Sequence, residues 1–133
     1  MRQILRLFYG SDKSGLAFPS MDDQGSTASW YVLSAMGFYT VNPARAEYII
    51  GSPIFDKVTI HLGNGKDFSI IAKKNSAKNI YIQSATLNGQ PLEKPWFSHS
   101  DIANGGKLEF LMGPSPNKHW GNAQDAAPPS MQN

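Results

Sequence analysis

Two adjacent carboxylates, Asp22 and Asp23, stand directly before a helical pattern in the stretch MDDQGSTASWYVLSAMGFY. Acids at this position commonly cap a helix, because the first turn has free backbone N–H groups and a partial positive charge. The same environment keeps a carboxylate ionised, which a general base requires. The residue pattern taken alone favours capping over catalysis for both acids.

Six aromatic side chains offer flat faces on which sugar rings could stack: Trp30, Tyr31, Phe38, Tyr39, Trp96 and Trp120. The first four lie at helical or near-helical spacing, which is more typical of a packed core than of a binding platform. For the two tryptophans nearer the C-terminus, packing beneath a loop is the favoured interpretation. The aromatic pattern therefore does not by itself indicate a carbohydrate site.

The three histidines, His61, His99 and His119, are far apart and lack the spacing of metal ligands. We therefore do not expect them to bind a metal. Asp101, in the stretch HSDI, lies close to a turn and is expected to cap the local backbone.

Two helices must position the acid pair. The first, at the start of the chain, carries an apolar stripe of Ile4, Leu5, Leu7 and Phe8. The second is expected from about Gln24 to Met36, with Gly37 as its left-handed C-terminal residue. It is apolar on nearly all sides, which is typical of a helix buried among other helices. Since the chain offers one helical partner, we expect it to be part of a longer protein.

From about residue 47 the apolar pattern changes to a period of two, which predicts five or six short strands. Asn64-Gly65 and Asn88-Gly89 each predict a type I′ hairpin turn, in which both central residues have positive φ. The expected fold is α+β: helices over 1–42, a small antiparallel β-sheet or sandwich over 43–116, and a disordered tail over 117–133.

Composition narrows the functional classes. The 133 residues have a net charge of +2 and no cysteine, so disulfides, thiol chemistry and cysteine-ligated zinc are excluded. No cluster of lysine and arginine indicates a nucleic-acid partner, and no apolar run approaches the ~20 residues of a membrane span. We expect neither nucleic acid nor membrane as a partner.

The acid pair is followed by an ordered series of motifs that resembles glycoside hydrolase family 92, the calcium-dependent exo-acting α-mannosidases. The series includes SWYVLSAMGFY, YIIGSPIFDK, LNG and the later GGKLEFLMG, and the resemblance covers residues from about 2 to 121. Family members are several times longer. The resemblance implies that this chain contains the last helices of an (α/α)6 barrel and the C-terminal β-rich region.

The resemblance also implies roles for single residues. Asp23 matches the position of the general base, and Asp22 is its neighbouring acid with a mainly structural role. The family pattern has an acid or amide two positions before the base, preceded by glycine, where this sequence has Met21 and Ser20. The family's general acid and most of its calcium ligands lie upstream, so Ca²⁺ is implied as a cofactor held mostly outside this chain.

The implied function is that of the C-terminal part of an α-1,2-mannosidase, which hydrolyses terminal α-mannosides with inversion and is incomplete as a catalyst alone. The implied partners are α-mannosyl glycans and, through an exposed helix face, a second copy or the missing N-terminal portion. The alternative is a non-catalytic β-sandwich module that binds glycan or protein. A remnant of a disrupted coding region is a third possibility. The resemblance implies a periplasmic or secreted location.

Overall fold

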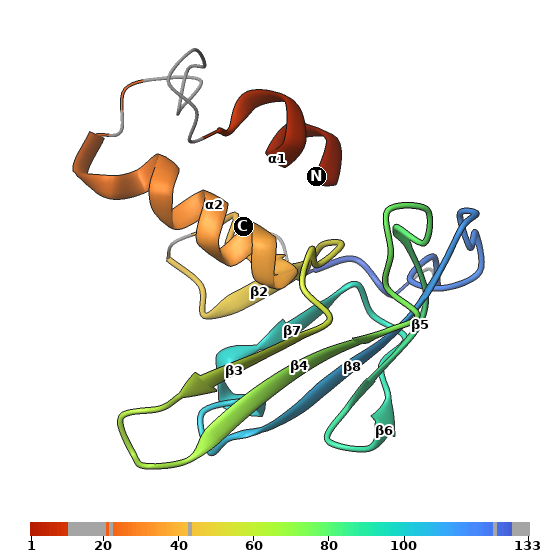
Figure 1. Cartoon of the computed structure of the whole chain (residues 1–133). Helices are drawn as coiled ribbons and strands as arrows, with labels where there is room; N and C mark the ends of the chain where they lie inside the picture. The colour runs from red at the N-terminus through yellow and green to blue at the C-terminus, as the bar shows by residue number, and fades with distance from the viewer. Residues whose placement is uncertain (11–20, 22, 43, 124, 129–133) are drawn as a thin grey trace.

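The computed structural model describes residues 1–10, 21, 23–42, 44–123 and 125–128. Two helices, α1 (Arg2–Phe8) and α2 (Ser26–Met36), lie together at one end of the molecule, above two β-sheets (Figure 1). A short 3₁₀ turn, η1 (Asp23–Gly25), leads into α2. The predicted α+β class is confirmed. No helix among the described residues has both the length and the apolar character needed to cross a membrane.

The C-terminal end of α2 follows the sequence prediction. Gly37 has a φ of 106°, and its N–H donates to the carbonyls of Leu33 and Ser34, which closes the last turn. A Cβ at Gly37 would lie 3.0 Å from Cβ of Pro53, so the glycine also permits close packing against the following loop. Only Ser34 and Ala35 of α2 are buried.

The N-terminal end of α2 differs from the prediction. The N-cap residue is Gly25, with φ of 77°, and no side chain among the described residues caps it. Gln24 also has positive φ, 53°, so two successive left-handed residues separate Asp23 from the helix. The expectation that Asp23 caps α2 is therefore wrong, because the chain turns before the helix starts. Asp22 lies outside the described residues.

The three-stranded sheet is antiparallel, in the order β1-β2-β7. Its strands are β1 (Phe38–Tyr39), β2 (Glu47–Ile50) and β7 (Trp96–Ser98). Strand β1 follows α2 directly, so the sheet begins where the helix ends.

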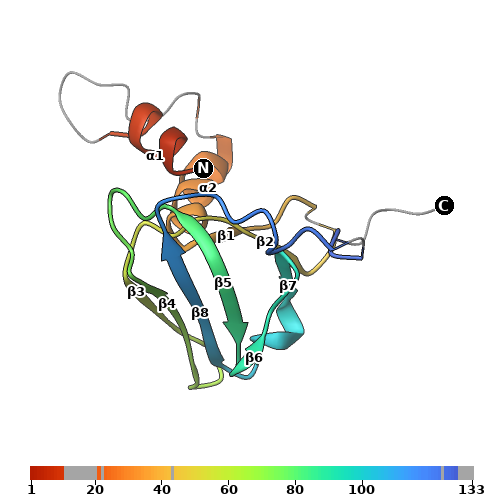
Figure 2. The ribbon, with the colours of Figure 1, turned by 90° about the vertical axis from the view of Figure 1, so that its right-hand side faces the viewer.

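The five-stranded sheet has the order β3-β4-β8-β5-β6. Its strands are β3 (Lys57–His61), β4 (Asp67–Lys73), β5 (Tyr81–Leu87), β6 (Gln90–Pro91) and β8 (Gly106–Gly113). Figure 2 shows β4, β8 and β5 side by side beneath the helices. Three of its pairs are antiparallel as expected, whereas β4 and β8 are parallel. A parallel pair needs a long connection, and here β5, β6 and β7 supply it.

The two predicted hairpin turns differ in outcome. Asn88 and Gly89 have φ of 53° and 83°, so the type I′ prediction is confirmed between β5 and β6. Asn64 does not have positive φ, and Gly65 alone does, at 77°. The prediction of a type I′ turn there is therefore wrong. The connection is a three-residue loop, 63–65, in which the Asn64 side chain accepts from the Lys66 N–H and donates to the Ala103 carbonyl.

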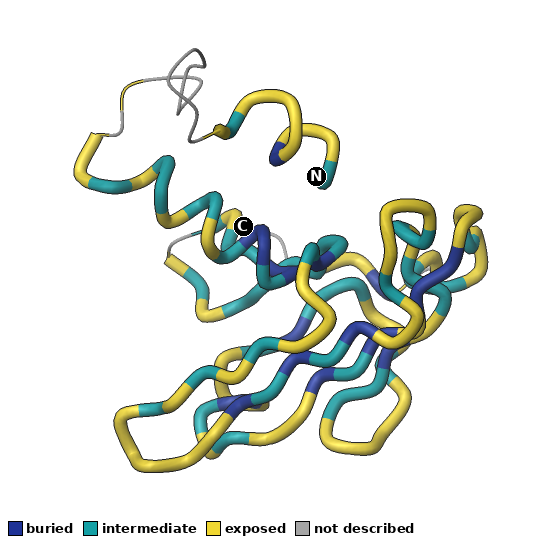
Figure 3. Tube along the Cα trace, in the orientation of Figure 1, coloured by how far each residue is buried: buried dark blue, intermediate teal, exposed yellow. Residues whose placement is uncertain are grey.

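The core lies between the two sheets, and Figure 3 shows its buried positions concentrated on β4 and β8. Alternate residues of these strands face inward: Phe68, Ile70, Ala72, Leu108, Phe110 and Met112. Phe97 of β7 and Phe38 of β1 complete the core from the other sheet, with ring centroids 5.6 Å apart. The period of two seen in the sequence thus becomes one buried face per strand.

The 3₁₀ turn η2 (His99–Asp101) confirms the role predicted for Asp101. Its carboxylate accepts from the Ser98 N–H at 2.8 Å, while the Ser98 hydroxyl accepts from the Ser100 N–H at 3.3 Å. This reciprocal arrangement is a capping box. The expected domain boundaries stay a prediction, although Trp120 and Ala126, within the expected tail, pack against the β-region.

The outward face of the five-stranded sheet carries a charged cluster around Glu109. Glu109 lies between Lys73 (Nζ–Oε1 2.9 Å) and Lys107 (Nζ–Oε2 3.1 Å). The hydrogen bonds from Lys73 and then Lys107 hold the pKa of Glu109 below its ordinary value of 4.5. The ionised carboxylate therefore stabilises the folded state.

We expect Gly106→Ala to destabilise the fold by about 1–3 kcal/mol. Gly106 has φ of 131°, and an added Cβ would lie 2.1 Å from Oδ1 of Asn88. That oxygen accepts from the Lys107 N–H, so the clash breaks the link between the β5–β6 turn and β8. Urea unfolding measures the change. The control is Gly63→Ala, where an added Cβ meets nothing within 4 Å; equal midpoints for the two variants would contradict the prediction.

We expect Glu109→Gln to lower the free energy of unfolding near neutral pH by about 0.5 kcal/mol, since the lysine partners are largely exposed. Because the folded pKa of Glu109 is depressed, its contribution is present above 4.5 and is lost as the pH falls through the lower folded value. The wild type and variant should therefore converge in acid. Urea unfolding at several pH values tests this, with Glu93→Gln as the control; a pH-independent difference would refute it.

Candidate functional site

The candidate site is the exposed turn that holds Asp23. The residue lies on η1, at the end of α2 farthest from the two sheets (Figure 1). Its side chain is exposed and forms no hydrogen bond or ion pair within the described part of the chain. A carboxylate in this state is free to accept a proton from a bound water. It lacks, among these residues, a second carboxylate placed opposite it.

The residues preceding Asp23 are only partly described. Met21 is 81% exposed, and its thioether presents neither a negative charge nor a strong hydrogen-bond acceptor. Asp22 and Ser20 lie outside the described residues, so their predicted roles stay predictions. The described part of this turn therefore offers one carboxylate, that of Asp23.

The aromatic side chains near α2 pack on one another. The ring of Tyr9 stacks on Trp30 at 5.5 Å between centroids and lies 5.0 Å from Tyr31, while Trp30 meets Tyr39 edge-on at 6.5 Å. These four rings are half-buried and link the segment after α1 to α2 and β1. Their mutual contacts support the packing interpretation over a sugar-stacking platform.

A cavity of about 540 Å³ lies beside α1 and is lined by Leu5, Arg6, Tyr31, Asp56 and Ile80, among others. Arg2 forms part of its wall, but the guanidinium is already committed. It donates to the carbonyls of Pro53 and Ser76 and to Oδ1 of Asn75. These bonds attach α1 to the loops that flank β3 and β4. Arg2 is thus a structural link that the sequence interpretation missed.

Burial lowers the pKa of Arg2, and the nearby Asp56 carboxylate partly opposes that shift. Two of the Arg2 hydrogen bonds reach residues far along the chain: Asn75 is 73 positions away and Ser76 is 74 positions away. No local pattern could have revealed these bonds, because the partner loops become neighbours of α1 only in the folded chain.

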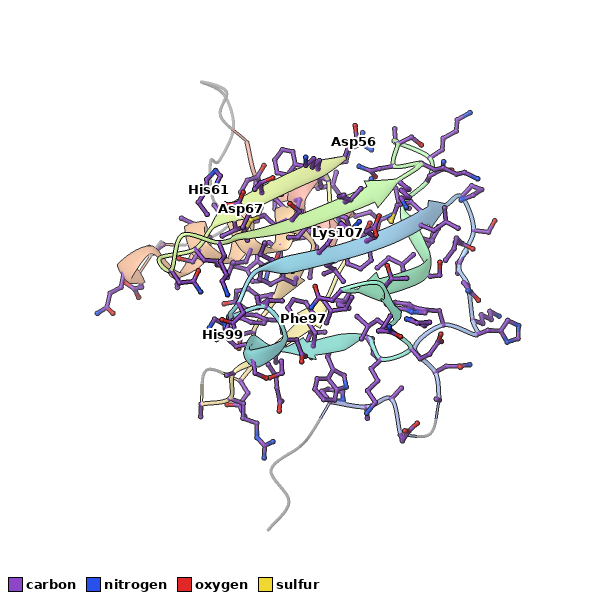
Figure 4. All side chains as sticks on the ribbon, turned by 90° about the horizontal axis from the view of Figure 1, so that it is seen from below. Asp56, His61, Asp67, Phe97, His99 and Lys107 are labelled. Atoms are coloured by element: carbon purple, nitrogen blue, oxygen red, sulfur yellow. The ribbon has the colours of Figure 1, made fainter. Side chains whose placement is uncertain are left out.

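The histidines lie in separate places. His61 Nδ1 lies 2.6 Å from Oδ1 of Asp67, and His99 Nδ1 lies 3.0 Å from the Tyr48 hydroxyl. Figure 4 shows the His61–Asp67 pair at one end of β3, with Asp56 at the other and His99 near β7. Among the described residues, no three side chains of His, Asp or Glu come together as a metal site.

The outward face of the five-stranded sheet bears on the alternative of a glycan-binding module. Strand pairing places Thr59, Ser69, Lys107 and Thr86 on this face, along with the Glu109 cluster. Lys107 is labelled there in Figure 4. Among the described residues, Tyr81 is the one tyrosine, phenylalanine or tryptophan that strand pairing places on this face. It lies at the start of β5, opposite Gly113 of β8. Flat stacking on sugar rings is therefore not favoured at this surface.

The chain was compared with known families and proteins. Residues 1–114 match the Glycosyl hydrolase family 92 catalytic domain. An uncharacterized secreted glycosidase of Arthroderma benhamiae is 36% identical over 116 residues, which are 85% of this chain and 15% of that protein.

Solved structures extend this similarity to three dimensions. A family GH92 α-mannosidase from Bacteroides thetaiotaomicron, in complex with mannoimidazole, is 35% identical with a TM-score of 0.90 over 98% of this chain. A family GH92 inverting mannosidase from the same organism is 42% identical with a TM-score of 0.81 over 90% of this chain.

The chain spans only 15% of the secreted glycosidase, 17% of the first mannosidase and 16% of the second. The similarity is nevertheless continuous through α1, the candidate site, α2 and both sheets, since it covers nearly all of this chain. On these grounds the chain belongs to glycoside hydrolase family 92.

Proposed function

We propose that this chain is the C-terminal part of an exo-acting α-mannosidase that hydrolyses terminal α-1,2-linked mannosides with inversion. One observation carries the proposal: nearly the whole chain shares its fold and about a third of its residues with an α-mannosidase solved with mannoimidazole. The inverting outcome is supported by the second mannosidase, which is described as inverting. The linkage specificity rests on the family resemblance of the sequence.

In this proposal Asp23 is the general base. Inverting hydrolysis needs one carboxylate that takes a proton from water and one carboxylic acid that protonates the leaving oxygen, about 6.5–9.5 Å apart. The water oxygen forms a bond to the anomeric carbon as the glycosidic bond breaks on the opposite face. Asp23 is suited to the first role because it is exposed and uncommitted within the described residues. The acid must come from outside this chain.

We propose that calcium is held mostly by residues outside this chain. The described residues do not fit a calcium site, since no three acidic or histidine side chains gather in one place. Ca²⁺ requires about 6–8 oxygen ligands, often from several carboxylates. Asp23 alone could supply at most a small share of that set.

The docking partner in this proposal is the rest of the family fold. Six large apolar side chains in the N-terminal helical part are exposed among the described residues: Met1, Ile4, Leu7, Phe8, Met21 and Val32. Apolar patches of this kind mark interaction surfaces. More than four-fifths of the chain of each of these solved relatives lies outside the matched part. We propose that such a portion covers this face and brings the acid to Asp23.

We further propose an exported protein, periplasmic or secreted. Support comes from the related glycosidase of Arthroderma benhamiae, which is described as secreted. An exo-acting mannosidase outside the cytoplasm would meet α-mannosyl glycans directly. Fractionation of the host cell, with detection by an antibody against this chain, tests the location.

We expect the chain alone to release no mannose from α-1,2-mannobiose with added calcium. Grafted in place of the matching segment of the 35% identical mannosidase, it should restore turnover. In that chimera Asp23→Asn should lower kcat by about a hundredfold or more, because the water loses its base. Asp125→Asn, also an exposed acid, is the control. Robust release by the chain alone that is lost in Asp23→Asn would overturn the incomplete-site proposal.

We expect the isolated chain to self-associate through its exposed helix face. Leu7, 76% exposed on α1, is the test position. Leu7→Glu should shift sedimentation toward the monomer, since a charge at an apolar contact opposes association. Val41→Glu, at a side chain 74% exposed in the segment between β1 and β2, is the matched control. Identical sedimentation of the wild type and Leu7→Glu would argue against the docking surface.

A further inference from the structure

The C-terminal strap, residues 114–123 and 125–128, follows β8, and all of it after residue 114 lies beyond the family match. It is fastened first to β5. The Gln83 side chain donates to the Ser115 carbonyl at 2.8 Å, and the Asn117 side chain donates to the Gln83 carbonyl at 2.8 Å. Gln83 stands at the irregularity in the β5–β8 pairing, so its backbone carbonyl is available for this bond.

Two tryptophans fasten the strap at its other end. The Trp120 indole N–H donates to the Leu92 carbonyl at 2.7 Å, and the Trp96 indole N–H donates to the Ala126 carbonyl at 3.1 Å. The bonds run in opposite directions, one from the strap and one toward it. Ala126 is only 2% exposed, and Trp120 packs against the hydrophobic core. These contacts therefore hold Trp120 and Ala126 of the strap against the segment that contains Leu92 and Trp96.

The strap crosses the molecule where the two sheets end. Strand β6 is the last strand of the five-stranded sheet, and β7 is the last strand of the three-stranded sheet. The segment between β6 and β7 passes from one sheet to the other. Leu92, its first residue, and Trp96, the first residue of β7, are the two residues that bond to the tryptophan end of the strap. Among the described strands, β7 pairs with β2 alone. An edge strand of this kind has strand hydrogen bonds along one side and leaves the backbone groups of its other side unpaired unless another segment covers them.

We propose that the C-terminal strap is a conformational lock on β7, and that its release is the lowest-energy local opening of this part of the molecule. The importance of β7 comes from Phe97, which is 2% exposed and contacts Phe38, Tyr48 and Phe68. Opening β7 would withdraw this ring from the junction of the two sheets. The strap thereby protects the packing beneath α2. This proposal does not depend on the catalytic role of Asp23.

Hydrogen exchange of the full chain, read by mass spectrometry, tests the lock. Trp96→Phe and Trp120→Phe each keep an aromatic ring but remove one indole hydrogen bond. Each should speed exchange of backbone amides in residues 92–98 by about fivefold, the effect of losing one net hydrogen bond. Exchange in β4 and β8 should be unchanged. Trp30→Phe, in the aromatic cluster near α2, makes the same chemical change away from the strap.

A chain ending after Gly113 gives a second test, with urea unfolding to show that it folds. If it folds, residues 92–98 should exchange faster than in either single variant, because all fastenings are gone. If it does not fold, the two single variants still decide the question. Unchanged exchange of residues 92–98 in both single variants would overturn the proposal. So would an equal acceleration in Trp30→Phe, since that would indicate general loosening.

Discussion

The packing of Phe97 against three other aromatic rings is the contact on which the rest of the structure depends. Its ring lies 5.6 Å from Phe38, 5.3 Å from Tyr48 and 6.3 Å from Phe68, between centroids. Phe38 and Tyr48 come from the three-stranded sheet and Phe68 from the five-stranded sheet. Burying a ring of this size contributes about 1.5–3 kcal/mol relative to exposure. Without Phe97, the two sheets would lose their main shared contact.

This core also sets the position of the candidate base. Phe38 follows Gly37, the residue that ends α2, so the helix is fixed to the sheets at its C-terminal end. The rings of Tyr9 and Trp30 hold the end of α1 near α2, and Arg2 attaches α1 to the loops that flank β3 and β4. Asp23 lies at the opposite end of α2, where the described residues offer few contacts. The sheets and core therefore fix the end of α2 opposite Asp23, while Asp23 itself is exposed among the described residues.

The sequence predicted much of this arrangement, and the errors have identifiable physical causes. Alternation correctly marked a strand-rich region from residue 47, but it predicted five or six strands where the described residues form seven, and it missed β1. Gly37, Asp101 and the Asn88-Gly89 turn were correctly interpreted because each depends on neighbours a few residues away. Asn64-Gly65 failed because the Asn64 side chain bonds to Ala103, 39 positions away, and a different turn results. Asp23 was wrongly expected to cap α2 because two left-handed residues intervene. The aromatic pattern left two interpretations open that only packing could separate.

The sequence by itself determined the family, the strand pattern and the residue proposed as base, since ordered motifs and periodicity are local properties of the chain. Only the tertiary structure decided that β4 and β8 run parallel, that Arg2 ties α1 to loops more than 70 positions away, and that Trp120 and Ala126 bond to Leu92 and Trp96. These features depend on contacts between distant segments. Burial of a common core brings those segments together, and no local pattern records which of them will meet.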